Sequence, residues 1–266
     1  MNQELVVGSL FAFALTSLLL WILEPVARQT GLVDHPSGRK THTHPTPLVG
    51  GIAMFAAFAF SVLTYDVPLS TYRLLFAGAL LVVFVGVLDD LRGLSARQRF
   101  GAQIVASLLM AVGAGVVLSD LGHLILPGGI VSLGILSIPI TVFAAVGVIN
   151  AVNMSDGLDG LAASLVLVTF VSLGVIAWAG GDATAFGILS ILAAIVLAFL
   201  TFNLRLSGRA LVFMGDAGSM FLGFVLAWFL IKLSQGEDRL LAPVTALWVF
   251  ALPLSLIHIS EPTRLL

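Results

Sequence analysis

Long apolar runs alternate with short polar links along the chain, and this pattern predicts membrane-spanning helices. A helix needs about 20 apolar residues to cross the hydrocarbon core of a bilayer. Runs on that scale fall at 5–23, 48–65, 72–88, 101–118, 135–152, 160–179, 184–202, 217–233 and 241–257, the fifth of them weakened by Pro139. We therefore expect an all-α polytopic integral membrane protein with about nine transmembrane helices.

Composition supports the membrane setting and narrows the function classes. The chain has 266 residues, of which 59% are hydrophobic and only 10% are charged. A soluble domain of this size could not bury so much apolar surface. The first run lacks a basic start and is too long for a typical signal peptide, so it is expected to be a span. The absence of cysteine excludes disulfides, and a net charge of −2 gives no reason to expect nucleic acid as a partner.

The basic residues predict the orientation of the chain in the membrane. Links after the first, third and seventh runs hold Arg28, Arg39, Lys40, Arg92, Arg97, Arg99, Arg205 and Arg209, whereas the opposite links hold only Arg73, Lys232 and Arg239. Cytosolic links carry the excess of Lys and Arg. We therefore expect the N-terminus outside and these three links in the cytosol. The same alternation places five carboxylates at the cytosolic ends of runs, namely Asp89, Asp90, Asp156, Asp159 and Asp216.

The link at 150–160 holds the richest group of polar side chains. Asn153, Asp156 and Asp159 offer hard oxygen ligands suited to Mg²⁺ or to a sugar or base hydroxyl. The alternative is structural, with Asp156 as the N-cap and Asp159 in the first turn of the next helix. Gly157 and Gly160 favour a ligand, because glycine lets backbone approach it closely.

Two other segments carry the remaining aspartates. Asp216 lies between Gly215 and Gly218 at the start of an apolar run, where it is either a helix cap or part of a phosphate site. Asp89 and Asp90 are adjacent, so their charges repel and need a cation or a shared proton. Alternatively, they form a solvated turn and pair with the arginines that follow. Either carboxylate could act as a base.

The first cytosolic link adds bases and a dense Pro and Gly pattern. Arg39 and Lys40 could clamp a diphosphate, whereas ordinary positive-inside charge explains the bases but not the Pro and Gly residues. His42 and His44 resemble a metal pair, but in such a link we expect them to be solvated.

Together, four segments resemble the polyprenyl-phosphate N-acetylhexosamine-1-phosphate transferases. They occur in the family's order over residues 31 to 254, and comprise 39–42 with 47–51, 88–90, 153–160 and 213–219. The motifs Pro47-Leu-Val-Gly-Gly51 and Met214-Gly-Asp-Ala-Gly-Ser219 are similar to those of the WecA/TagO-like branch rather than the MraY branch.

The resemblance implies a Mg²⁺-dependent enzyme, with Mn²⁺ as an alternative metal, in the bacterial cytoplasmic membrane. It would transfer a sugar-1-phosphate, by default GlcNAc-1-phosphate, from a UDP-amino sugar to undecaprenyl phosphate. The reaction would occur on the cytosolic face, release UMP and initiate cell-envelope polysaccharide synthesis, such as that of lipopolysaccharide O-antigen or teichoic acid. A homodimer is compatible with the family.

The resemblance also implies roles for individual residues. Asp216 matches the principal metal ligand, assisted by Asp89, and Asp89 with Asp90 matches the acidic pair assigned to the lipid phosphate. The cluster at the nucleotide sugar would be Asn153, Asp156 and Asp159, with Asp156 and Asp159 also catalytic, and the diphosphate contacts would be Lys40 and His42.

Three other functions were weighed against this one. An MraY-like phospho-MurNAc-pentapeptide transferase differs in its donor. A secondary transporter should hold its acids near the bilayer midplane, whereas these aspartates lie at the ends of runs. An intramembrane aspartyl protease is suggested by Gly215-Asp216, but Phe213 replaces its first glycine and Tyr65-Asp66, the candidate partner, falls on the outer side.

The chain departs from the family at two places. Gly93 stands where some relatives carry a third aspartate of the acidic cluster. Residues 255–266 match nothing in the family, whose chains continue into a cytosolic loop with a His-x-His-His motif and further spans. We therefore expect residues 1–254 to form the transferase membrane domain, and residues 255–266 to be a tail produced by truncation of a longer family fold.

Overall fold

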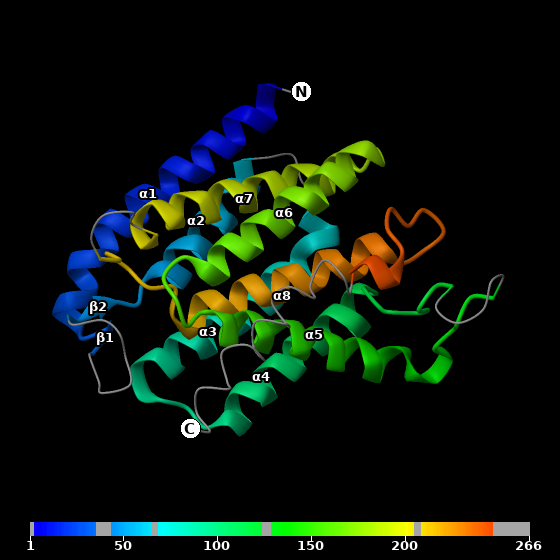
Figure 1. The fold of residues 1–266 in the computed structure, drawn as a ribbon, viewed down its shortest axis with the longest axis horizontal. Coiled ribbons are helices and arrows are strands. Elements are labelled where there is room, and N and C mark those ends of the chain that lie inside the picture. Colours follow the sequence, from blue (N-terminus) through cyan, green and yellow to red (C-terminus); the bar gives the residue numbers. More distant parts are fainter. Residues whose placement is uncertain (1–2, 36–43, 65–68, 124–128, 205–208, 247–266) are drawn as a thin grey trace, which may run out of the picture.

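The computed structural model describes residues 3–35, 44–64, 69–123, 129–204 and 209–246, and these form a bundle of helices (Figure 1). The helices are α1 (Gln3–Thr30), α2 (Gly50–Thr64), α3 (Leu69–Arg92), α4 (Ala96–Leu108), α5 (Ser137–Ser155), α6 (Leu161–Ala179), α7 (Ala183–Asn203) and α8 (Gly215–Ser234). A π-helical turn, Leu109–Gly113, continues α4, and a short 3-10 turn, Gly134–Leu136, leads into α5. The strands in the described ranges are β1 (Val33–Asp34) and β2 (Thr46–Pro47), which pair antiparallel.

The all-α membrane class is confirmed, while the count of nine spans stays a prediction. Six described helices are long and apolar enough to cross a membrane, namely α1, α3, α5, α6, α7 and α8. Helix α2 is apolar but has only 15 residues. Most of the ninth predicted run, 241–257, lies outside the described residues.

Local contacts explain two features at the starts of helices. Helix α4 begins at Ala96, because the side chain of Gln98 accepts the Ser95 backbone N–H at 2.9 Å and so caps the new helix. Pro139 does not interrupt α5, since it lies in the first turn, where a backbone N–H has no partner within the helix.

Helix α8 forms the centre of the bundle. It contacts α2, α3, α5 and α6 and runs through the middle of the helices in Figure 1. The buried share of its apolar stretch is 94%, whereas the other five candidate spans reach 56% at most. Helix α8 is therefore surrounded by protein rather than by lipid along most of its length.

Glycines let the neighbouring helices reach the backbone of α8. A Cβ on Gly51 of α2 would overlap the backbone of Gly218, and one on Gly86 of α3 would overlap Ala217. On the other side, a Cβ on Gly223 would lie 2.6 Å from the Cα of Ile149 in α5. Small residues at such crossings allow close van der Waals packing where lipid supplies no hydrophobic drive. Helices α2, α3 and α5 are thus fixed against the first half of α8.

Backbone hydrogen bonds attach the first link to the segment that leads into α8. Gly50 and Gly51 donate to the carbonyls of Phe213 and Met214, both at 3.0 Å, and Phe213 donates to the carbonyl of Pro47 at 2.8 Å. Two of the four segments that carried the family resemblance therefore pair directly with each other. Their glycines serve packing here.

We expect Gly86→Ala to destabilise the protein by about 1–3 kcal/mol, because the added methyl group overpacks the crossing of α3 and α8. The matched control is Gly101→Ala in α4, where nothing lies within 4 Å of the added Cβ. There the substitution should stabilise by about 0.5–1 kcal/mol, since alanine favours helix over glycine. Thermal unfolding in detergent micelles measures both, and equal effects would contradict this account of the crossing.

Candidate active site

Asp90, at the end of α3, caps the start of α8. Its Oδ1 accepts the backbone N–H of Asp216 at 2.9 Å, and its Oδ2 accepts that of Ala217 at 3.3 Å. The first amides of a helix lack partners within the helix and carry its positive dipole end, so a carboxylate there is favourable. Gly215 turns the chain into α8 with a φ of +69°, and a Cβ there would meet the Asp90 carboxylate. Both Asp90 oxygens are thus engaged by backbone, while its role at a lipid phosphate stays a prediction.

Asp89 faces a different partner and is nearly buried, with 7% of its surface exposed. Its Oδ1 accepts the Leu94 backbone N–H at 2.6 Å, and its Oδ2 lies 3.0 Å from Nη1 of Arg99. The same nitrogen lies 3.7 Å from Oδ2 of Asp216. One guanidinium from the first turn of α4 therefore stands between carboxylates from α3 and α8. The pairing of the acidic turn with an arginine, weighed above as an alternative, is what the structure shows for Asp89.

Asn153 connects the last turn of α5 to the first turn of α8. Its Nδ2 donates to Oδ1 of Asp216 and, at 2.8 Å, to Oγ of Ser219. The amide nitrogen faces the carboxylate, so in this geometry Asn153 orients Asp216. Because Asp90 supplies the cap of α8, the Asp216 side chain is not a cap and is available to Asn153 and Arg99.

Asp156 and Asp159 lie in the link between α5 and α6, not on a helix. Helix α5 ends at Ser155, and the N-cap of α6 is Gly160, with a φ of +76°. The reading of Asp156 as N-cap of the next helix is therefore wrong, because Asp156 follows the C-terminus of α5. Asp159 is exposed on this link.

Asp156 belongs to the same electrostatic group as Asp216. The pKa of Asp156 is raised from its ordinary 3.8 to about 7, chiefly by burial and then by the neighbouring charges of Asp216 and Asp159. The carboxyls of α3, α8 and the α5–α6 link thus form one acidic cluster. This is the gathering that the alternation of runs predicts.

Asn203, at the end of α7, holds the two loops of the site together. Its Oδ1 accepts the Gly160 backbone N–H at 2.6 Å, and its Nδ2 donates to the Val212 carbonyl at 2.9 Å. The side chain is buried, with 4% exposed. Asn203 and Ser219 are the site residues that the sequence reasoning missed, and it also missed the contact of Arg99 with Asp216. A polar residue closing an apolar run was the one signal for Asn203.

Lys40 and His42 lie outside the described residues, so their contact with a diphosphate stays a prediction. The described end of the same link, at Pro47, reaches Phe213 just before Asp216. The link therefore returns to the bundle beside the acidic cluster.

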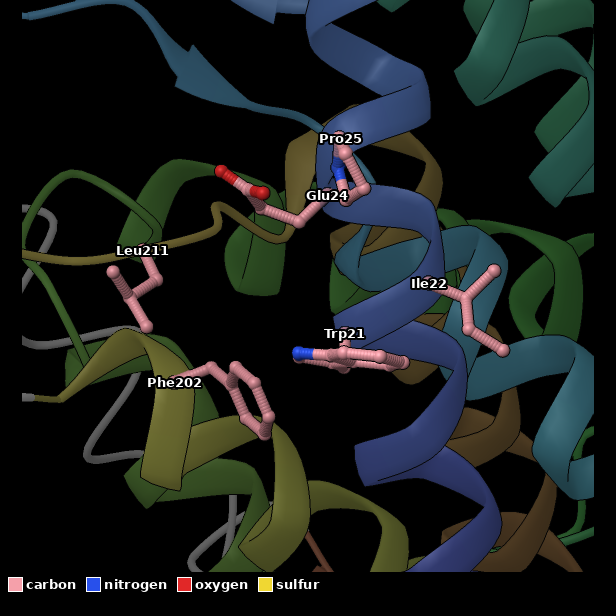
Figure 2. A pocket seen from close by; sticks show the side chains of 6 residues that line it. All are labelled: Trp21, Ile22, Glu24, Pro25, Phe202 and Leu211. Atoms are coloured by element: carbon pink, nitrogen blue, oxygen red, sulfur yellow. The ribbon is translucent and has the colours of Figure 1, made fainter.

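Two hollows in the described part of the chain lie away from this cluster. One, of about 530 Å³, opens between α1 and the end of α7 (Figure 2), and is lined by Trp21, Ile22, Glu24, Pro25, Phe202 and Leu211. Its single charged group, Glu24, is paired with Arg28 at 2.6 Å. The other, of about 430 Å³, is almost wholly apolar and lies between α5 and α8. Neither offers the convergent polar groups that orient a small-molecule substrate.

The cluster fits a divalent cation held by two carboxylates. Among the described residues, no group of three His, Cys, Asp or Glu side chains has metal-binding spacing. Mg²⁺ needs no such group, because it commonly takes one or two carboxylates and completes its octahedron with water and substrate phosphates. Oδ2 of Asp89 is buried and accepts no hydrogen bond from the described residues, and its ion pair with Arg99 shows that a positive charge fits beside it.

Comparison with known proteins matches the sequence of the chain to one family. The model of glycosyl transferase family 4 matches residues 72–234. The undecaprenyl-phosphate alpha-N-acetylglucosaminyl 1-phosphate transferase of Escherichia coli K12 is 40% identical over 246 residues, or 91% of this chain and 66% of the relative. The enzyme of the same name from Yersinia pestis is 39% identical, over 96% of this chain and 68% of the relative. The chain thus spans about two thirds of the length of these relatives. The resemblance seen in the sequence is confirmed, and the chain belongs to glycosyl transferase family 4, within its WecA/TagO-like branch.

Proposed function

We propose that the protein transfers GlcNAc-1-phosphate from UDP-GlcNAc to undecaprenyl phosphate. The observation that carries the proposal is the meeting of three distant segments at the first turn of α8, where Asp90 binds its amides and Asn153 and Arg99 contact Asp216. The relatives are named for this activity, and their sequences align with 91–96% of this chain.

The reaction that fits is a displacement at phosphorus. An oxygen of the lipid phosphate forms a bond to the β-phosphorus of the donor, which carries the sugar. The bond from that phosphorus to the oxygen bridging to the α-phosphate breaks, and its electron pair leaves with UMP. Such a transfer asks the protein mainly to position the groups and to neutralise charge.

The residues of the site supply positioning and charge in different ways. Asp216 and Asp89 would hold Mg²⁺, or Mn²⁺ in its place, and the ion would offset negative charge on the phosphates when bound. Asp90 keeps the start of α8 in place, and Asn153 orients Asp216. Asp156 and the exposed Asp159 would accept hydroxyls of the nucleotide sugar, and Lys40 and His42 would contact its diphosphate.

The location of the acids favours a transferase over a transporter. In the described helices, Asp89 and Asp90 lie at the end of α3 and Asp216 lies at the start of α8. A site at helix ends can receive a soluble nucleotide sugar and a lipid phosphate at the membrane surface. The excess of bases in the same links supports a cytosolic site in a bacterial cytoplasmic membrane, with the N-terminus outside.

We expect Asp216→Asn to lower the rate of transfer by at least about 100-fold, because the site loses a carboxylate that would hold Mg²⁺ and with it the positive charge that offsets the phosphates. The assay combines detergent-solubilised protein, Mg²⁺, undecaprenyl phosphate and labelled UDP-GlcNAc, and follows UMP and the glycolipid. Asp238→Asn, at an exposed position after the far end of α8, is the matched control and should leave the rate unchanged. Wild-type protein that forms no UMP, or an unimpaired Asp216→Asn, would end the transferase proposal.

Asp156 should make the stability of the metal-free protein fall as pH rises. Its pKa is about 7 in the folded protein and 3.8 ordinarily, so folding favours the protonated form. The stabilisation is complete below pH 3.8 and is lost as pH rises through about 7. Thermal unfolding in EDTA as a function of pH measures this loss. Asp156→Asn should flatten the profile in that window, and an unchanged slope would show that Asp156 does not titrate as described.

A further inference from the structure

The free oxygens of Asp89 and Asp216 converge on one arginine. Oδ1 of Asp89 is taken by the Leu94 amide, Oδ1 of Asp216 by Asn153, and both oxygens of Asp90 by the start of α8. The remaining oxygens, Oδ2 of Asp89 and Oδ2 of Asp216, lie 3.0 and 3.7 Å from Nη1 of Arg99. Arg99 therefore stands where a cation shared by these two oxygens would have to bind.

The contact between Arg99 and the carboxylates is electrostatic but incomplete. Oδ2 of Asp89 is buried, yet it receives no hydrogen bond of good geometry from the described residues, even though Nη1 is only 3.0 Å away. A buried acceptor without a hydrogen bond retains much of its desolvation cost. One guanidinium beside two carboxylates also leaves an excess of negative charge. A small divalent ion would remove both deficits.

The Arg99 side chain is placed so that it can move away from the two carboxylates. Arg99 comes from the first turn of α4, whereas the carboxylates come from α3 and α8, and its side chain is 34% exposed against 5% for that of Asp89. A long arginine side chain at such an edge can turn outward without disturbing the helices. Once turned outward, it would still face an anionic substrate entering the site.

We propose that Arg99 is a displaceable counter-ion of the cation site. It neutralises Asp89 and Asp216 while the site lacks a divalent ion, and it yields those two oxygens when the ion binds. This inference rests on the proposed function, which supplies a divalent ion held by Asp89 and Asp216. It adds that the Arg99 side chain and the ion compete for the same two carboxylate oxygens. Arg99 is then a positioning residue that keeps the acidic cluster assembled between turnovers.

Direct Mn²⁺ binding, followed by electron paramagnetic resonance without substrates, tests the competition. We expect Arg99→Gln to bind Mn²⁺ at least about 5-fold more tightly than wild type, because the ion no longer displaces a bound cation. Arg97→Gln is the matched control, since it removes the same charge from an exposed position in the same turn. Its Kd should stay within about 2-fold of wild type, because exposed charges are screened.

Stability supplies the second readout. In EDTA, Arg99→Gln should unfold at a lower temperature than wild type, and saturating Mn²⁺ should raise its unfolding temperature more than that of wild type. Weaker or unchanged Mn²⁺ binding in Arg99→Gln, or equal tightening in Arg97→Gln, would overturn the proposal. If Arg99→Gln does not fold, Arg99→Lys takes its place. Its shorter ammonium should compete less well and tighten Mn²⁺ binding by a smaller factor, and an unchanged Kd would overturn the proposal.

The binding assay also separates this inference from the transfer activity. Tightened Mn²⁺ binding in Arg99→Gln together with a wild type that forms no UMP would leave the counter-ion standing and remove the proposed function. Normal transfer by wild type, with no change in Mn²⁺ affinity in Arg99→Gln, would support the proposed function and overturn the counter-ion role of Arg99.

Discussion

The carboxylate of Asp90 on the first amides of α8 is the interaction on which the site depends. It fixes the end of α3 to the start of the central helix, and thereby sets the position of Asp89 relative to Asp216. Glycine crossings at Gly51 and Gly86 hold the same region from α2 and α3. A chain with so few charged residues can bring Asp89, Asp90 and Asp216 together here because each of the three has a local partner, whether a backbone amide, an amide side chain or a guanidinium.

Two adjacent aspartates have different roles because they have different partners. Asp89 and Asp90 are neighbours in sequence, but one faces Arg99 and the other faces backbone. A carboxylate saturated by two amides has little capacity left for an ion or a substrate, whereas Asp89 has a buried oxygen to offer. The geometry therefore shows Asp90 supporting the start of α8, and it agrees with the proposal that Asp89 and Asp216 hold the cation.

Much of the fold could be predicted from the sequence, because the length and apolarity of a run are local properties. Eight of the nine runs coincide with described helices, and five aspartates at run ends proved to share one side. One predicted boundary was wrong because a cap decides it: α4 begins directly after Ser95, whereas the apolar run begins at residue 101.

The contacts within the site could not be predicted, because they join residues far apart in the chain. The cap of α8 comes from α3, so the start of α8 gives no sign of it. Arg99 is expected either as positive-inside charge or as a partner of the acidic turn, and nothing near it in sequence shows that its guanidinium also reaches Asp216. A glycine beside Asp216 is compatible with close packing or with ligand approach, and only the structure shows that Gly218 meets Gly51 at a helix crossing.

The most direct test is to locate the cation in a crystal of the protein grown with Mn²⁺, by its anomalous scattering. The account predicts one ion shared by Oδ2 of Asp89 and Oδ2 of Asp216, with Arg99 turned away and Asp90 still bound to the amides of Asp216 and Ala217. An ion bound by Asp90 with those amides released, or an ion that leaves Arg99 between the two carboxylates, would contradict it.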